Sequence, residues 1–155
     1  ESRAVGICGS STRQRSIVFA DTANPNQFTI NGKPYNPNCV DTVTTLGDIE
    51  EWTIQNTAQE AHVLHIHQLD FQVTEINGEP KPFTGYQDVV TLPPASDDGP
   101  SVVTVIIPFT NPVIVGKFVY HCHIIQHEDQ GMMATIIVQQ PGAPPPDEPL
   151  CQPEG

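Results

Sequence analysis

The chain is built from short apolar runs separated by turn residues. Ten runs rich in β-branched and aromatic residues follow one another between Ser16 and Gln139. They occupy residues 16–20, 27–30, 42–46, 49–56, 62–67, 71–76, 87–92, 101–109, 116–121 and 133–139. In run 101–109, every second residue from Val103 to Ile107 is apolar, as on one face of a strand. The pattern predicts an all-β sandwich.

Two dipeptides predict tight turns between these runs. Asn31-Gly32 and Asn77-Gly78 are favoured in two-residue hairpin turns, because both central positions must accept a positive φ. No amphipathic helical stretch of useful length occurs, but residues 124–131 (IIQHEDQG) are compatible with one short helical turn. We therefore expect little helix.

The two ends of the chain differ from its middle. Residues 1–15 are polar and lack apolar periodicity, so we expect a leading strap or linker without secondary structure. Residues 139–155 are rich in proline and acidic residues and should run extended over a surface; a disordered terminus is the alternative. One domain, residues 16–138, is left in a chain of 155 residues.

The charge of the chain excludes some partners. With 6 Lys and Arg against 18 Asp and Glu, the net charge of -12 repels nucleic acid and anionic membrane surfaces. No apolar run approaches the roughly 20 residues needed to cross a bilayer. The chain begins at Glu1 without Met or a signal-peptide pattern, which favours a mature chain or a fragment.

The four cysteines, Cys8, Cys39, Cys122 and Cys151, form no C-x-x-C pair. Only Cys122 has histidine neighbours. The other three can supply one disulfide and leave one thiol over, with the pairing open. This count favours an oxidising location, secreted, periplasmic or cell-surface, and a bridge to something outside the chain. Free thiols in a reducing compartment are the alternative.

All six histidines fall in two short segments, 62–67 (HVLHIH) and 121–127 (HCHIIQH). Structural histidines scattered through a core would not cluster so completely, and the second segment also holds a cysteine. Imidazole and thiolate groups gathered in this way indicate a metal site.

Strand alternation divides these residues between two faces. Neighbouring side chains on a strand point to opposite faces, and residues two apart share a face. One face carries His62 and Cys122, and the other carries His65, His67, His121 and His123. The sequence thus predicts two metal sites back to back.

The first site would gather His62, Cys122 and, from the loop beyond, His127 and Met132. A thiolate with two imidazoles and a weak axial thioether is the ligand set of a blue copper electron-transfer centre. Met133 is the alternative axial ligand, but its opposite parity and the apolar residues after it favour a core position. The four histidines of the other face would be half of a multinuclear copper site, because the chain has no further histidine.

The two segments resemble the H-x-x-H-x-H and H-C-H-x-x-x-H-x-x-x-G-M signatures of the last domain of multicopper oxidases, most closely cuprous oxidases and spore-coat-type laccases. The likeness includes FTINGKPY, EEWTIQNT and DFQVTEINGEP and covers about residues 16–138. It implies a cupredoxin-like Greek-key β-sandwich. Val63 departs from the pattern, since many members have proline there, and should alter loop stiffness more than ligation.

The resemblance also implies roles for the site residues. The type 1 copper ligands would be His62, Cys122, His127 and Met132; His65 would bind the type 2 copper, and His67, His121 and His123 the type 3 pair. A small reducing substrate, phenol-like or a metal ion, would give single electrons near the exposed edge of His127. These would pass through Cys122 and its flanking histidines, and four would reduce O2 to water.

Glu128 matches an acidic residue that delivers protons in related oxidases. A carboxyl group there is chemically sensible, because water formation consumes protons. A solvated loop carboxylate beside Asp129 is the alternative role.

Family members take their remaining copper ligands from an N-terminal cupredoxin domain, which must be another chain or a missing part of the same polypeptide. The chain would then be an oxidoreductase of the laccase-like class only when completed, and alone incapable of O2 reduction. A stand-alone electron carrier with one type 1 copper is the alternative function. A sandwich without metal would leave every one of these ligands idle.

Overall fold

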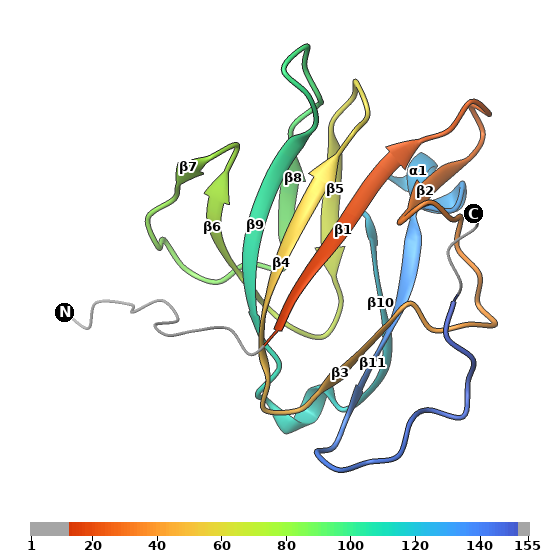
Figure 1. Ribbon diagram of the computed structural model, residues 1–155, viewed down its shortest axis with the longest axis vertical. Helices are drawn as coiled ribbons and strands as arrows, with labels where there is room; N and C mark the ends of the chain where they lie inside the picture. The colour runs from red at the N-terminus through yellow and green to blue at the C-terminus, as the bar shows by residue number, and fades with distance from the viewer. Residues whose placement is uncertain (1–12, 152–155) are drawn as a thin grey trace.

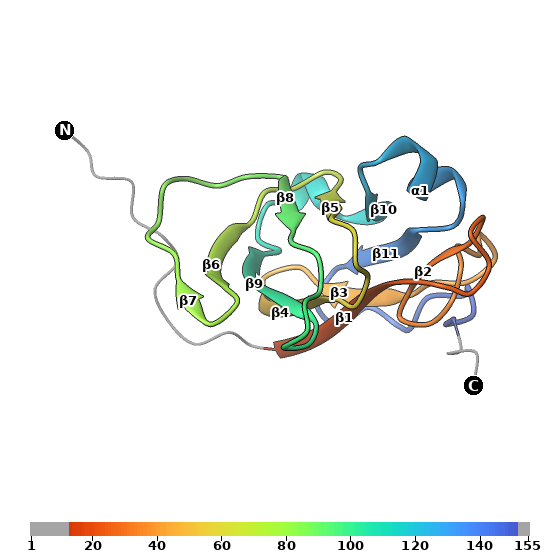
Figure 2. The same ribbon diagram turned by 90° about the horizontal axis from the view of Figure 1, so that it is seen from above.

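The computed structural model describes residues 13–151, which form two packed β-sheets (Figures 1 and 2). The predicted β-sandwich with one short helical turn is confirmed. The elements are β1 (Arg13–Asp21), β2 (Phe28–Ile30), β3 (Thr42–Thr45), β4 (Ile49–Asn56), β5 (His62–Ile66), β6 (Gln72–Ile76), β7 (Glu79–Pro80), β8 (Val89–Leu92), β9 (Ser101–Pro108), the 3-10 turn η1 (Pro112–Ile114), β10 (Gly116–Cys122), α1 (Ile125–Asp129) and β11 (Met133–Gln139).

One sheet has the strand order β2-β1-β4-β9-β6-β7 and the other β3-β11-β10-β5-β8. The β1–β4 and β3–β11 pairs are parallel, and the other strand pairs are antiparallel. Seen from above in Figure 2, β6, β9, β4 and β1 lie along one side, with β8, β5 and β10 along the other. The apolar core fills the space between the sheets.

Both Asn-Gly turns are confirmed. Asn77 and Gly78 have φ of 50° and 81° and join β6 to β7, where Ile76 pairs with Glu79. Asn31 and Gly32 have φ of 54° and 80° and turn the chain after β2. Each dipeptide therefore supplies the positive φ values that a two-residue hairpin requires.

Strand β1 begins three residues before the predicted domain, inside the expected leading strap. Arg13–Arg15 pair with the parallel strand β4 through their backbones, so no apolar side chains are needed there. The Arg15 side chain lies 2.5 Å from the carboxylate of Glu50, which is fully buried on β4 and also accepts the Trp52 indole N–H at 3.0 Å. Glu50 occupies an inward position of β4, where strict alternation would place an apolar residue. The apolar alternation of residues 49–56 is therefore incomplete.

The tail beyond β11 runs over the surface and is fixed there. Cys151 forms a disulfide with Cys39, 112 residues earlier, which settles one pairing; Cys8 lies outside the described residues. The Cys151 N–H donates to the Val40 carbonyl oxygen at 2.8 Å, and the Val40 N–H donates to the Pro149 carbonyl oxygen at 2.9 Å. The tail thus pairs with Val40 through the backbone of Pro149 and Cys151, so its prolines do not prevent the pairing.

Candidate metal centre

Strands β5 and β10 bring the two histidine segments side by side. They are antiparallel neighbours, with His65 opposite His121 and Leu64 opposite Cys122. The short helix α1, which follows β10, returns His127 towards Cys122. The structure gathers the predicted ligands into two groups, one of His62, Cys122 and His127 and one of His65, His121 and His123.

The first group is a buried triangle of donor atoms. The Cys122 Sγ atom lies 3.7 Å from His62 Nδ1 and 3.6 Å from His127 Nδ1, and the two Nδ1 atoms are 3.0 Å apart. The centre of such a triangle is about 2 Å from each corner, close to the usual bond lengths from a metal to imidazole nitrogen and thiolate sulfur. The residues therefore fit a single metal ion.

Two carboxylates orient the imidazoles of this group. Asp21 Oδ1 lies 3.1 Å from His62 Nε2, and Glu60 Oε1 lies 3.3 Å from His127 Nε2. Because an ionised carboxylate only accepts hydrogen bonds, His62 donates from Nε2 to Asp21 and keeps its Nδ1 lone pair for the shared centre. Glu60 faces the corresponding nitrogen of His127. Sequence reasoning missed both carboxylates. Glu60 stands two residues before His62, whereas no sequence pattern points to Asp21.

Burial sets the protonation of the metal-free group. It lowers the pKa of His62; nearby His127 lowers it further, and Asp21 opposes the shift. Burial raises the pKa of the Cys122 thiol, against a hydrogen bond from the Val63 N–H, whose nitrogen lies 3.4 Å from Sγ. A metal ion must therefore displace the proton of the Cys122 thiol when it binds, whereas His62 is already neutral. One sulfur and two imidazole nitrogens form a donor set typical of copper.

His127 is less exposed than the resemblance implied. Only 7% of its side chain is accessible, because Phe28 packs on its ring and Glu60 Oε1 lies 3.3 Å from its outer nitrogen. The Glu60 side chain is 51% exposed, so the edge of the group reaches solvent through this carboxylate.

The two methionines face opposite sides. Met132 is fully buried; its N–H donates to the His127 carbonyl, and its carbonyl accepts the Cys122 N–H, both at 3.0 Å. Met133 lies opposite His121 in the β10–β11 register. The expectation that Met133 is the better core residue is wrong: it is only half-buried, and Met132 belongs to the core on the Cys122 side.

The second group lies on the outer face of the same strands. The His65 and His121 rings stack with centroids 5.2 Å apart, and His67 Nε2 lies 2.9 Å from His121 Nε2. His123 is exposed, so the group opens to the surface. Burial lowers the pKa of His65 and of His67, which favours neutral imidazoles ready to bind a metal.

Glu128 lies beside this second group. Its Oε2 atom is 3.3 Å from His121 Nδ1, which is also 2.9 Å from the Cys122 carbonyl oxygen. The Glu128 side chain is one-third exposed. It therefore touches both a candidate ligand and solvent.

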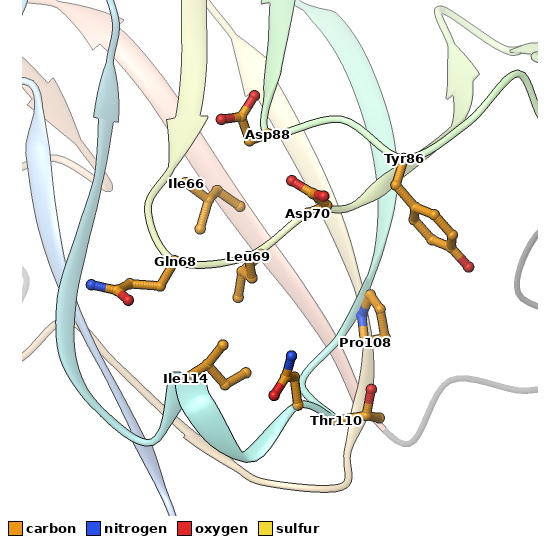
Figure 3. A pocket seen from close by; sticks show the side chains of 10 residues that line it. Ile66, Gln68, Leu69, Asp70, Tyr86, Asp88, Pro108, Thr110 and Ile114 are labelled. Carbon is orange, nitrogen blue, oxygen red and sulfur yellow. The ribbon is translucent and has the colours of Figure 1, made fainter.

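The structure also holds a cavity of about 600 Å³ near η1 (Figure 3). No histidine or cysteine of the described residues lines it. Asp88 connects it to the second group, with Oδ2 4.0 Å from His65 Nε2. The lining residues are Ile66, Gln68, Leu69, Asp70, Tyr86, Asp88, Pro108, Thr110, Asn111 and Ile114.

Within residues 13–151, no helix is long and apolar enough to cross a membrane.

The sandwich and its sulfur and imidazole donors define a metal-binding β-domain of the copper type. Residues 11–142 match the family described as multicopper oxidase, and the chain belongs to that family. It is 38% identical over 116 residues to multicopper oxidase mco of Staphylococcus haemolyticus, covering 71% of this chain and 24% of the relative. A laccase of Haloferax volcanii is 29% identical over 120 residues, covering 74% of this chain and 20% of the relative.

Among solved structures, the laccase of Pediococcus acidilactici superposes with a TM-score of 0.73 at 28% identity, over 89% of this chain and 29% of that one. The chain thus spans about a quarter of the length of its relatives. The family is one of copper-dependent oxidoreductases, and membership in it does not favour a stand-alone electron carrier.

Proposed function

We propose that the chain is the C-terminal copper domain of a laccase-like multicopper oxidase. The type 1 site would be formed by His62, Cys122, His127 and Met132. The observation that carries this proposal is the buried triangle of Cys122 Sγ and two Nδ1 atoms. Copper bound in it would supply one-electron redox chemistry. The Asp21 carboxylate would hold His62 in the tautomer that such an ion needs, and Glu60 faces the matching nitrogen of His127.

The second histidine group would supply this chain's share of a trinuclear site, with His65 for type 2 copper and His67, His121 and His123 for the type 3 pair. Cys122 lies between His121 and His123 in the chain, so short covalent paths join the two groups. The remaining ligands would come from an N-terminal cupredoxin domain, as another chain or a further part of the polypeptide. This proposal is supported by the exposure of His123, which leaves the second group open to the surface. Alone, the chain would not reduce O2.

The surrounding residues suggest how protons and electrons arrive. Glu128 would pass protons towards the site where O2 is reduced to water, because its carboxylate touches His121 and is partly exposed. Electrons from a small donor, phenol-like or a metal ion, would be taken up at the His127 edge beside Glu60. The Cys39–Cys151 disulfide supports a secreted, periplasmic or cell-surface location.

The replacement Cys122→Ser tests this function. Without the thiolate, the copper-loaded chain should lose the intense blue charge-transfer absorption of a type 1 site, as recorded by visible spectroscopy. A double variant Cys39→Ser with Cys151→Ser, which removes the two disulfide cysteines outside the donor groups, should keep the band. A Cys122→Ser chain that stays blue would contradict the proposal.

A further inference from the structure

One aromatic side chain covers two of the three buried donor residues. The Phe28 ring lies over the His127 ring, with centroids 4.3 Å apart and planes tilted by 39°. It also meets His62 edge-on, with centroids 6.0 Å apart. Phe28 is only 7% exposed, so it separates both imidazoles from solvent on this side. Aromatic rings packed at such distances stabilise each other's orientation.

The backbone around Phe28 holds the loop between His127 and Met132. The Phe28 N–H donates to the Gln130 carbonyl at 3.0 Å, and the Tyr35 N–H donates to the Gly131 carbonyl at 2.8 Å. These bonds tie the segment 28–35 to the loop at two successive residues.

Gly131 shows how close this approach is. Its φ of +105° favours glycine, and a Cβ atom there would lie 3.0 Å from Pro34 Cβ and 3.1 Å from the Phe28 carbonyl oxygen. No other side chain fits between the segment and the loop without displacing one of them. The segment therefore bears directly on the loop that carries His127 and Met132.

The chain that follows this segment, up to Asp41, is also fixed. The Asp41 N–H donates to the Thr135 carbonyl at 3.0 Å, and its carboxylate accepts the Thr135 N–H at 2.7 Å. The same carboxylate pairs with Lys33 Nζ at 2.7 Å, with both side chains nearly buried. Cys39, two residues earlier, carries the disulfide. These contacts restrain the chain that carries Phe28, so Phe28 stays packed against the loop.

We propose that Phe28 is a positioning residue of the metal centre, which fixes the His127 ring and keeps water from the metal. This inference rests on the proposed function. An apolar cover lowers the local polarity and disfavours the more highly charged Cu(II) relative to Cu(I). Phe28 therefore raises the reduction potential of the site and steadies the loop between its ligands.

The test compares Phe28→Ala and Phe28→Leu with Phe109→Ala and Phe109→Leu in the full chain. Phe109 directly follows β9, is fully buried and packs on Trp52, with ring centroids 6.3 Å apart. It matches Phe28 in type and burial but has no ring contact with the donor histidines.

The first measurement needs no metal. Amide hydrogen exchange at Gln130, Gly131 and Met132, corrected for the global stability of each variant, should be about tenfold faster in Phe28→Ala and unchanged in Phe109→Ala. Equal exchange in the two alanine variants would overturn the positioning role, whether or not the chain binds copper. If Phe28→Ala does not fold, the leucine pair decides in the same way with a smaller expected difference.

The second measurement uses the copper-loaded chains. The equilibrium constant for one-electron reduction should fall about tenfold in Phe28→Ala, or about 59 mV in potential, with the blue band kept. Phe109 variants should lose stability but keep the wild-type potential. An unshifted potential in a folded, blue Phe28 variant would overturn the inference. Absence of the band from the wild-type chain would instead refute the proposed function and leave the exchange result standing.

Discussion

At His62, burial and charge act in opposite directions. Its ring is fully buried, which disfavours the protonated form, while Asp21 at 3.1 Å from Nε2 favours it. Burial prevails, and the pKa is lowered. The same balance keeps the ring available as a ligand, because a protonated imidazole cannot bind a metal ion.

The lowered pKa of His62 predicts that the metal-free chain loses stability in acid. The unfolded chain takes up this proton near pH 6.5 and the folded chain only at lower pH, so the contribution is present above 6.5 and is lost as pH falls through the folded pKa. The urea midpoint should drop between pH 7.5 and 5.5. The drop should be smaller in His62→Gln, which cannot be protonated. Identical drops in the two proteins would argue against this assignment.

At the scale of elements, alternation along strands separated the two donor groups. In β5, His62, Leu64 and Ile66 are buried, and Val63 and His65 between them are partly exposed. Alternation is a local property of extended backbone, so it holds whatever the strand packs against. The boundary of β1 was not predictable in this way, because residues 13–15 are in the strand through backbone pairing and their side chains carry no apolar signal.

The tail is an element whose position depends on one covalent link. The Cys39–Cys151 bond closes a loop of 112 residues, which restricts the unfolded chain strongly. The double replacement Cys39→Ser with Cys151→Ser should lower the free energy of unfolding by about 2–4 kcal/mol, measured by urea titration. Lys117→Gln breaks the exposed tail contact with Glu148 and should cost less than about 1 kcal/mol. A double serine variant as stable as wild type would contradict this role.

At the scale of the whole molecule, one donor group is closed and the other is open. His62, Cys122 and His127 are all buried, whereas His123 is exposed and His65 partly so. A closed group can bind its metal with residues of this chain alone. In the proposed function the open group takes further ligands from another domain, and the chain spans about a quarter of the length of its relatives.

Copper content should follow this division. The chain alone should hold about one tightly bound copper, and its complex with the completing domain about four, as measured by elemental analysis. Only the complex should consume O2 in an oxygen electrode. His123→Gln, which spares the buried group, should reduce the copper content of the complex but keep the blue band. A complex that saturates at about one copper and consumes no O2 would favour the electron carrier instead.

The sequence by itself determined most of the strands, the Asn-Gly turns, the short helix and the division of the candidate ligands between two faces. Each of these depends on residues close together in the chain, where spacing and backbone preference decide the outcome. The tertiary structure alone decided which cysteines pair, which carboxylates meet His62 and His127, and that Phe28 covers them. Those contacts join residues 34 to 112 positions apart, such as Phe28 with His62 and Cys39 with Cys151, and strand pairing and loop paths between the sheets bring them together.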